Sequence, residues 1–400
     1  MQDVEPDGPA QWQAFTEALA AAGTGVHHAA DAHRSVAEQT QLTQSMIWGL
    51  IGELSSLALA DPDHPDWSPI LNGTLRRYNA NADTTYAVAY IRGSGTYRVV
   101  GRRGTTRIVH LQVGAGTLGI GDPDRMIITG DLNIDDCEIA EDGTFEVVLS
   151  AARPEGYTGA WLQLDASRDD SFALLRQVAY DWTSEIDAQV AIHRVDRTIA
   201  KAEISGARLT ANLVLAARSV GEDALAMLKV MEQQLELAEV NDLSDVSGTF
   251  PAVGVAGQAY THGLIELSDD EVWLAECRIP PECPYWSLQL MDFAYSALDA
   301  MYTQASLNGH MAVADPDGVY RIVVGAGDPG NANWLDTGGQ RRVQIRFRWY
   351  SSQAPSISTR VVRRDKLVEA LPEDTARVSA HERRRALTRR AVGLQWRRRW

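Results

Sequence analysis

Apolar positions along the first sixty residues follow a helical period. Ile47, Leu50, Ile51 and Leu54 recur at the i, i+3, i+4 spacing that places side chains on one face of a helix. A connector rich in Pro and Asp, "DPDHPDWSP", begins at Asp61 and ends this pattern. We therefore expect an N-terminal helical region over residues 1–60.

The pattern then changes to short runs of β-branched and aromatic residues. "TTYAVAYI", "TYRVV", "RIVHLQV", "FEVVLS" and "AWLQL" are separated by Gly and Asp turns such as "RGSG" and "EDG". Short strands at this spacing are typical of an antiparallel sandwich or barrel. Residues 61–170 are therefore expected to form a first β module.

Helical spacing returns near Ser171 and is clearest from Leu225 through Leu228 and Met231. We expect a helical segment over residues 171–250. Strand patterns follow, and the clearest is "RRVQIRFRWY", in which apolar and polar residues alternate. Residues 251–352 are expected to form a C-terminal β-sandwich, and residues 353–400 a basic tail with a short helix.

The predicted fold class is mainly β with helical segments, of the α+β type. It comprises two β modules, a helical preface and helices between the modules. Hydrophobic residues make up 45% of the chain and charged residues 22%, as in ordinary globular proteins. The length of 400 residues suits more than one domain.

Charge and cysteine content indicate which partners and which cellular compartment to expect. The net charge of −16 does not suit nucleic acid, although residues 360–400 hold 13 Lys and Arg against 5 Asp and Glu. No run approaches the length of about 20 apolar residues that a membrane helix needs, and the acidic N-terminus does not resemble a secretory signal. Three cysteines do not suggest a disulfide framework. We expect a cytoplasmic protein with no membrane partner.

Two Asn-rich loops are the main candidates for a site. "NANADTTY" carries Asn81, Asp83 and Tyr86 directly before a strand. It is read either as an Asx-type turn or as a polar ligand loop. "DPGNANWLDTGG" carries Asn333, Trp334 and Asp336; a Trp between hydrogen-bonding groups suits a sugar or another ring-shaped ligand. The alternative is that Trp334 only closes the end of a sandwich.

Further candidates lie outside these loops. Tyr285 and Trp286 fall on opposite faces of a predicted strand, so one of them can line a groove. Asp181 and Glu185 share a face if this segment is helical, which permits acid–base work or a solvated pair. Arg346 lies on the polar face of "RRVQIRFRWY", which either binds an anion or is solvated and paired with the acidic body. Three histidines cluster in the stretch "HHAADAH". This stretch lacks the HExxH arrangement of a zinc site, and we expect no metal site.

Six stretches in order resemble a bacterial family catalogued as domain of unknown function 1214, whose members often carry the related 1254 module upstream. They are "YNANADTTYAVAYI", "WLQLDASRDDSFALLRQVAYDWTSE", "GTFPAVG", "PYWSLQLMDF", "DPGNANWLDTGG" and "RFRWY". The resemblance covers roughly residues 72–362. It implies a β-sandwich with jelly-roll-like topology at the C-terminal end, and oligomers in some members. It supplies no settled reaction and therefore no catalytic residue.

Two function classes remain. The first is a cofactor-independent hydrolase or lyase acting on a small polar or glycosidic molecule; no Gly-rich nucleotide loop or GxSxG motif is present. Asp83, Asp336 and Glu185 are its acid–base candidates. The substrate-binding candidates are Asn81, Tyr86, Tyr285, Trp286, Asn333, Trp334 and Arg346. The second is a lectin-like binding module or a scaffold for a homo-oligomer. The enzyme reading requires the two Asn-rich loops to meet, with carboxyl groups roughly 5–10 Å apart for glycoside chemistry.

Overall fold

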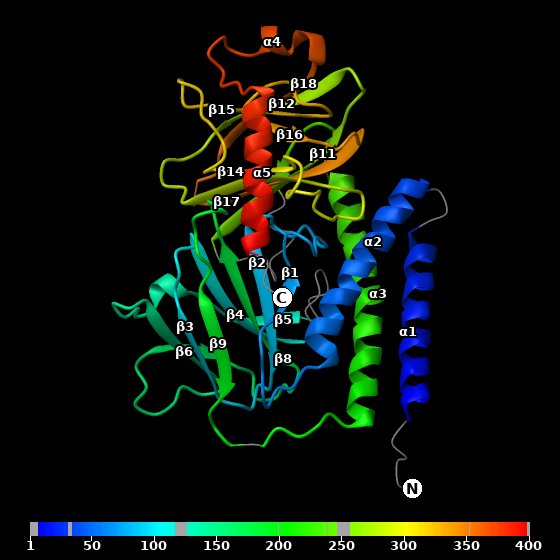
Figure 1. Ribbon diagram of the computed structural model, residues 1–400, viewed down its shortest axis with the longest axis vertical. Coiled ribbons are helices and arrows are strands. Elements are labelled where there is room, and N and C mark those ends of the chain that lie inside the picture. Colours follow the sequence, from blue (N-terminus) through cyan, green and yellow to red (C-terminus); the bar gives the residue numbers. More distant parts are fainter. Residues whose placement is uncertain are drawn as a thin grey trace.

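The chain folds into two β modules flanked by helices (Figure 1), which confirms the expected fold class. The computed structural model describes residues 7–30, 34–116, 126–198, 200–237, 239–245, 257–351 and 353–397. Within these residues no helix is both long and apolar enough to cross a membrane.

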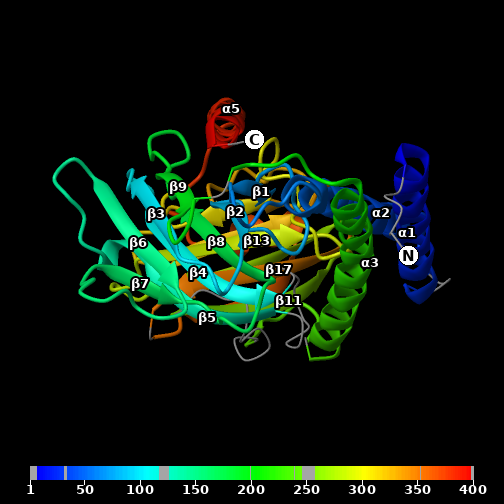
Figure 2. The ribbon, with the colours of Figure 1, turned by 90° about the horizontal axis from the view of Figure 1, so that it is seen from below.

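Three helices form one side of the molecule (Figure 2), and they are α1 (Gly8–Ala29), α2 (Val36–Glu53) and α3 (Gly206–Leu237). The first two confirm the helical preface. Ser35 and Glu38 form a capping box that starts α2. Val26, Leu42 and Met231 belong to one buried cluster, so all three helices share a small apolar core.

The N-terminal module is a sandwich of two sheets. Its inner sheet has the order β1-β2-β8-β4-β5, and its outer sheet the order β7-β6-β3-β9. The strands are β1 (Ser68–Leu71), β2 (Thr84–Ile91), β3 (Tyr97–Arg102), β4 (Ile108–Gly116), β5 (Met126–Asn133), β6 (Thr144–Ser150), β7 (Ala160–Gln163), β8 (Ser171–Val178) and β9 (Gln189–Arg194). Leu111 and Leu175 of the inner sheet pack against Val99 and Val147 of the outer sheet.

The expected helical segment over residues 171–250 is wrong in its first part. Ser171–Val178 is the central strand β8, and Gln189–Arg194 is the edge strand β9. Every residue of β8 is buried, because both faces of the inner sheet are covered. A strand buried on both faces loses the polar alternation that distinguishes it from a helix. The first β module therefore extends to Arg194, and only α3 is helical in this segment.

The C-terminal module is a second sandwich. Its inner sheet has the order β10-β11-β17-β13-β14, and its outer sheet the order β16-β15-β12-β18. The strands are β10 (Ser244–Asp245), β11 (Gln258–Glu266), β12 (Glu271–Arg278), β13 (Tyr285–Met291), β14 (Ser306–Asn308), β15 (Tyr320–Gly325), β16 (Trp334–Asp336), β17 (Arg342–Tyr350) and β18 (Ser356–Arg363). Strand β18 corrects the expected boundary at residue 353, because it completes the outer sheet.

The C-terminal segment ends in helix α5 (Ala380–Arg397), after the short helix α4 (Leu367–Ala370). Ser379 and Glu382 form a capping box at the start of α5, the short helix expected in this tail. Figure 1 shows α5 running along both modules. Gly393 permits this close approach, since a Cβ there would lie 2.8 Å from the Cβ of Trp182.

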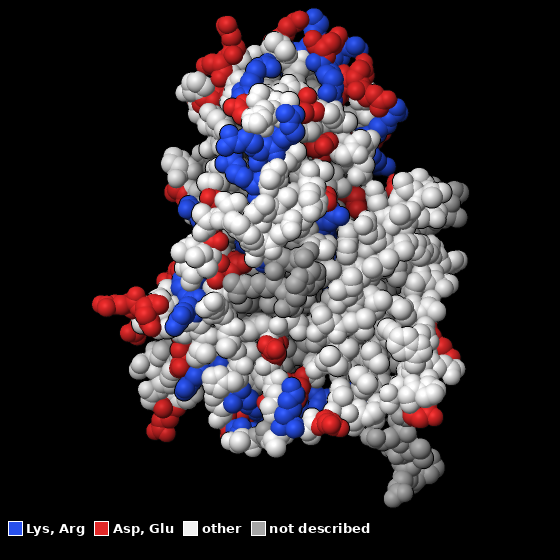
Figure 3. Space-filling view, viewed as in Figure 1, with Lys and Arg blue, Asp and Glu red and all other residues white. Residues whose placement is uncertain are grey.

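Arginines on two sides of α5 have different roles. Arg383, Arg390 and Arg397 recur every seven residues and are buried against the body. The remaining arginines, Arg384, Arg385 and Arg389, are exposed, and they contribute to the basic surface over α5 in Figure 3.

Candidate functional site

The inner sheets of the two modules face each other across a polar layer. Ile108 and Val178 of the N-terminal inner sheet pack with Tyr285 and Tyr350 of the C-terminal one. Beyond this contact the C-terminal sheet presents mostly polar side chains, and the N-terminal sheet presents polar side chains beside an apolar cluster that contains Phe172 and Leu174. We define the inter-sheet layer by its polar members, which are Tyr86, His110, Gln112, Asp131, Arg176, Tyr260, Arg346 and Arg348.

Strand register sets the N-terminal half of this layer. Arg176 of β8 pairs directly with Tyr86 of β2 on one side and with His110 of β4 on the other. Directly opposed residues share a face of the sheet, so these three side chains form one row. Gln112 pairs with Asp131 of β5 and belongs to the next row. Apolar neighbours such as Leu111 point the other way, into the module core.

His110 and Asp131 form a hydrogen-bonded pair. Nδ1 of His110 lies 2.7 Å from Oδ1 of Asp131, and Nε2 of Gln112 donates to Oδ2 at 2.5 Å. A carboxylate on Nδ1 favours the tautomer that carries its proton there, which leaves Nε2 as an acceptor. Such a pair can take up a proton and return it. His110 and Asp131 were not among the candidates from the sequence.

Arg346 and Arg348 form the C-terminal half of the layer, and only 1% and 4% of their surfaces are exposed. Nη2 of Arg348 donates to the Asn79 carbonyl at 2.7 Å, while its Nη1 is buried without a hydrogen-bond partner in the described part of the chain. Burial lowers the pKa of Arg346, which donates to the Tyr295 hydroxyl. The expectation of a solvated arginine face is therefore wrong for these two residues. It holds only for Arg342 at the start of the strand.

The Tyr260 hydroxyl interacts electrostatically with guanidinium groups of both sheets. Burial raises the pKa of the Tyr260 hydroxyl, and the charges of Arg348 and Arg176 oppose this shift. Arg176 comes from the N-terminal sheet and Arg348 from the C-terminal one. Tyr86 and Asp131 are only half-buried, so solvent reaches the layer at these two residues.

The loop before β2 docks onto the C-terminal inner sheet. Tyr78 and Asn79 adopt left-handed backbone conformations, with φ of 56° and 54°. They turn the chain so that Asp83 lies between the modules, with 2% of its surface exposed. Asn81 donates to the Tyr285 hydroxyl at 2.6 Å. The loop is therefore both a turn and a junction between the two modules.

Asp83 is held by three buried donors. Its carboxylate accepts from Trp182 Nε1 at 2.8 Å, from the Tyr285 hydroxyl at 2.7 Å and from Asn308 Nδ2 at 2.8 Å. Burial raises its pKa, and these hydrogen bonds oppose the shift. Both carboxylate oxygens of Asp83 already accept hydrogen bonds from the protein. We therefore assign Asp83 a structural role.

The second Asn-rich loop uses its side chains within its own module. Asn333 Oδ1 accepts from the Val313 amide at 2.8 Å, and Trp334 Nε1 donates to the Gly325 carbonyl at 2.9 Å. Trp334 packs with Leu367 beneath the C-terminal segment. Asp336 accepts from the Gly338 amide at 2.9 Å. Trp334 therefore closes the end of the sandwich, as the alternative interpretation expected.

Asp83 and Asp336 occupy different hydrogen-bond networks. The Asp83 carboxylate accepts from Trp182, Tyr285 and Asn308 between the modules. The Asp336 carboxylate accepts from the Gly338 amide at the end of β16. The two carboxylates share no donor, so these hydrogen bonds give no support to the expected acid–base pairing of the two loops.

Two other candidate residues, Glu185 and Trp286, also have structural roles. Glu185 lies in a turn after β8 rather than on a helix, and its carboxylate accepts from the amides of Asp181 at 3.0 Å and Arg107 at 2.9 Å. Trp286 is buried in the C-terminal core, with its ring centroid 5.0 Å from that of Tyr320. Of the substrate-binding candidates, Tyr86 and Arg346 belong to the inter-sheet layer, and Asn81 and Tyr285 lie beside it.

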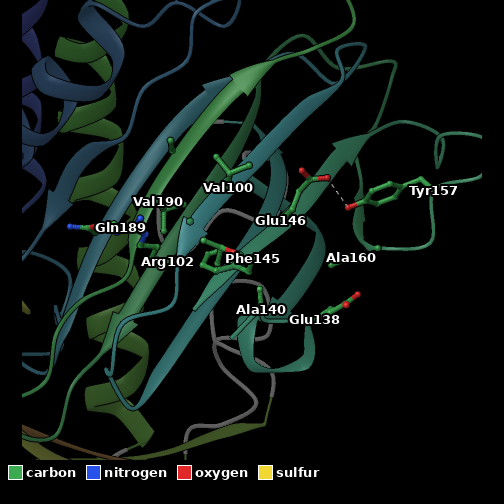
Figure 4. A pocket seen from close by; sticks show the side chains of 14 residues that line it. Val100, Arg102, Glu138, Ala140, Phe145, Glu146, Tyr157, Ala160, Gln189 and Val190 are labelled. Atoms are coloured by element: carbon green, nitrogen blue, oxygen red, sulfur yellow. Dashed lines mark hydrogen bonds between the residues drawn. The ribbon is translucent and has the colours of Figure 1, made fainter. Parts of the chain in front are cut away.

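A shallow groove of about 780 Å³ lies on the other face of the outer N-terminal sheet. Figure 4 shows Val100, Glu146 and Tyr157 among the side chains that line it, and the Tyr157 hydroxyl donates to Glu146 at 3.4 Å. The groove is open and holds no cluster of titratable groups comparable to the inter-sheet layer. It is a poorer candidate for chemistry.

Metal ligands do not gather among the described residues, where no three His, Cys, Asp or Glu side chains meet. His27 contacts Thr43, with Nε2 and Oγ1 3.0 Å apart. Asp31 and His33 of the same histidine-rich stretch lie outside the described residues.

Comparison with known proteins supports the fold and gives no activity. A crystal structure of an uncharacterised protein from Burkholderia cenocepacia is 28% identical, with a TM-score of 0.79 over 90% of this chain and 98% of that one. The VPA0106 protein from Vibrio parahaemolyticus is 12% identical, with a TM-score of 0.43 over 84% of this chain and 100% of that one. The second likeness is too low to carry an argument. No curated protein matches the chain.

A family match lies in the C-terminal sandwich. Residues 272–354 match the family described as "Protein of unknown function (DUF1214)", and they include β12 to β17. The expected motif "GTFPAVG" lies outside the described residues. Residues 272–354 thus match the family of unknown function 1214, which confirms over these residues the resemblance seen in the sequence.

Proposed function

We propose that the protein binds a small organic anion in the inter-sheet layer and acts on it by acid–base catalysis, as a cofactor-independent hydrolase or lyase. The observation that carries this proposal is the buried Arg348, whose Nη1 has no partner among the described residues. Burying an unpaired guanidinium donor costs free energy, which an anionic ligand would recover. Arg176 and Arg346 lie on the same layer.

The side chains of the inter-sheet layer favour a polar ligand that carries a carboxylate or phosphate group. A guanidinium binds either group through two parallel hydrogen bonds. Tyr86 and Tyr260 supply hydroxyls and ring faces, and Gln112 supplies an amide, so a sugar acid or hydroxy acid suits the layer. His110 would accept a substrate proton at Nε2 while its Nδ1 proton stays on Asp131.

Binding without turnover is the second candidate, and one observation favours it. The carboxylates expected to form an acid–base pair, Asp83 and Asp336, occupy separate structural sites. A lectin-like protein would need the arginines of the layer but not the proton transfer. Cytoplasmic location, jelly-roll topology and self-association stay predictions from the sequence.

Replacing Arg346 with Gln is expected to weaken anion binding at least tenfold, which is about 1.4 kcal/mol. The probes are gluconate, galacturonate and malate, screened by thermal shift and then titrated by calorimetry. Arg342→Gln is the matched control, because Arg342 lies on the same strand and the same face but is exposed. It should change the dissociation constant less than twofold. Equal losses in both variants, or no binding by the wild type, would refute the anion site.

Replacing His110 with Gln separates catalysis from binding. We expect turnover of a bound acid to fall by about 10²–10⁴, the usual contribution of a general acid–base group. The dissociation constant should stay within threefold, since the arginines remain. Proton NMR of the incubated acids measures turnover. If the wild type binds an acid and leaves it unchanged, the binding-only function replaces the enzymatic one.

A further inference from the structure

A second pocket lies beneath helix α5, where the helix meets both modules. Its volume is about 290 Å³, near the lower end for small-molecule sites. Trp182 lines it from the N-terminal module, Leu307 and Val313 line it from the C-terminal module, and Ala386 lines it from α5. Half of the lining residues are apolar, and the wall comes from three separate parts of the chain.

Arg390 gives this pocket a buried positive charge. Its Nε donates to the Ala300 carbonyl at 3.1 Å and its Nη2 to the Ser306 hydroxyl at 2.8 Å. Its Nη1 meets only the Met311 sulfur, at 3.1 Å, and a thioether is a weak acceptor. The Arg390 guanidinium also lies 4.6 Å from the centre of the Trp182 ring. No carboxylate pairs with it within the described part of the chain.

Charges of both signs act on Arg390, because Asp83 and Asp299 favour its cationic form and Arg383 opposes it. Burial lowers the pKa of Arg390 to about 10, so it stays cationic at neutral pH. Arg389 adds an exposed charge at the rim. Arg383 is paired with Asp328 at 3.0 Å. Asp181, the carboxylate of the lining, is occupied by the Ser184 hydroxyl at 2.7 Å and lies 3.7 Å from His310.

We propose that this pocket binds a small apolar carboxylate, with the acid group at Arg390 Nη1 and Arg389 and the hydrocarbon body against Leu307, Val313 and Ala386. A charge-assisted bond to a carboxylate is stronger than the contact with the Met311 sulfur, which the ligand would replace. The apolar side chains of the wall favour a hydrocarbon body over the polar acids that suit the inter-sheet layer. The ligand would join α5 to both modules, so its binding raises the stability of the native state.

Naphthalene-2-carboxylate is the probe for this site, titrated into the full chain by calorimetry. Its amide, 2-naphthamide, has a similar shape without the charge and should bind at least tenfold more weakly. Ala386→Phe and Ala332→Leu fill the pocket from two sides and should each abolish binding. Thr388→Phe adds the same ring on the exposed side of α5 and should leave binding unchanged.

Arg346→Gln distinguishes this pocket from the inter-sheet layer, because Arg346 does not line it. Naphthalene-2-carboxylate should bind that variant as it binds the wild type. Loss of binding in Arg346→Gln, with retention in both pocket-filling variants, would overturn the inference and assign the probe to the inter-sheet layer. Failure of the wild type to bind at millimolar concentration would also overturn it, without affecting the test with polar acids.

Discussion

Replacing Asp83 with Ala is expected to lower the free energy of unfolding by about 3–5 kcal/mol. The substitution removes the acceptor of three buried donors, on Trp182, Tyr285 and Asn308. Each donor left unpaired in the interior costs about 1–3 kcal/mol. The three come from both modules, so the loss also weakens the junction between them.

Asp336→Ala is the matched control for this prediction. Asp336 accepts one hydrogen bond, from the Gly338 amide, in a turn that solvent reaches. Its loss should cost less than about 1 kcal/mol. Urea denaturation of both variants measures the difference. If both variants lose a comparable free energy of unfolding, Asp83 does not stabilise the junction between the modules.

Replacing Arg397 with Met is expected to cost about 3–5 kcal/mol, the usual result of removing one partner of a buried ion pair. Arg397 Nη2 lies 2.9 Å from Asp187 Oδ1, and the two side chains are 4% and 2% exposed. The same guanidinium donates to the Asp83 carbonyl at 2.7 Å and to the Gln177 carbonyl at 2.9 Å. The Arg397 side chain therefore connects the C-terminal end of α5 to the N-terminal module.

Two further variants identify why Arg397→Met lowers the free energy of unfolding. Arg389→Met removes an exposed arginine from the same helix and should change stability by less than about 0.5 kcal/mol. Asp187→Asn added to Arg397→Met should recover part of the loss, because it removes the uncompensated buried charge. A double-mutant cycle measures this coupling. If no stability returns in the double variant, packing rather than the ion pair accounts for the effect.

Local pattern predicted much of the fold correctly. The helical preface, most strands and the short helix near the C-terminus follow from residue types a few positions apart. Strand β8 was missed because Phe172 and Leu174 on one face and Ala173 and Leu175 on the other are all buried. Buried faces on both sides remove the alternation that marks a strand. The number of neighbouring layers is a property of the whole fold and not of the segment.

The site was less predictable for a related reason. Polar residues at Arg346 and Arg348 alternate with apolar ones, which indicates two faces but not which face solvent reaches. The same alternation at His110 and Gln112 was a signal that two faces of β4 differ. Asp131 joins His110 only through the register of β4 and β5, and no local pattern specifies this pairing. The Asn-rich loops drew attention because their composition is unusual, yet their polar groups are largely used in turns and junctions.

The most direct test of the anion site is a crystal structure of the protein soaked in selenate, whose selenium is located by anomalous scattering. We expect a selenium peak in the inter-sheet layer, with an oxygen about 3 Å from Arg348 Nη1 and others near Arg346 or Arg176. Peaks confined to exposed arginines, with the layer free of selenate, would contradict anion binding in the inter-sheet layer.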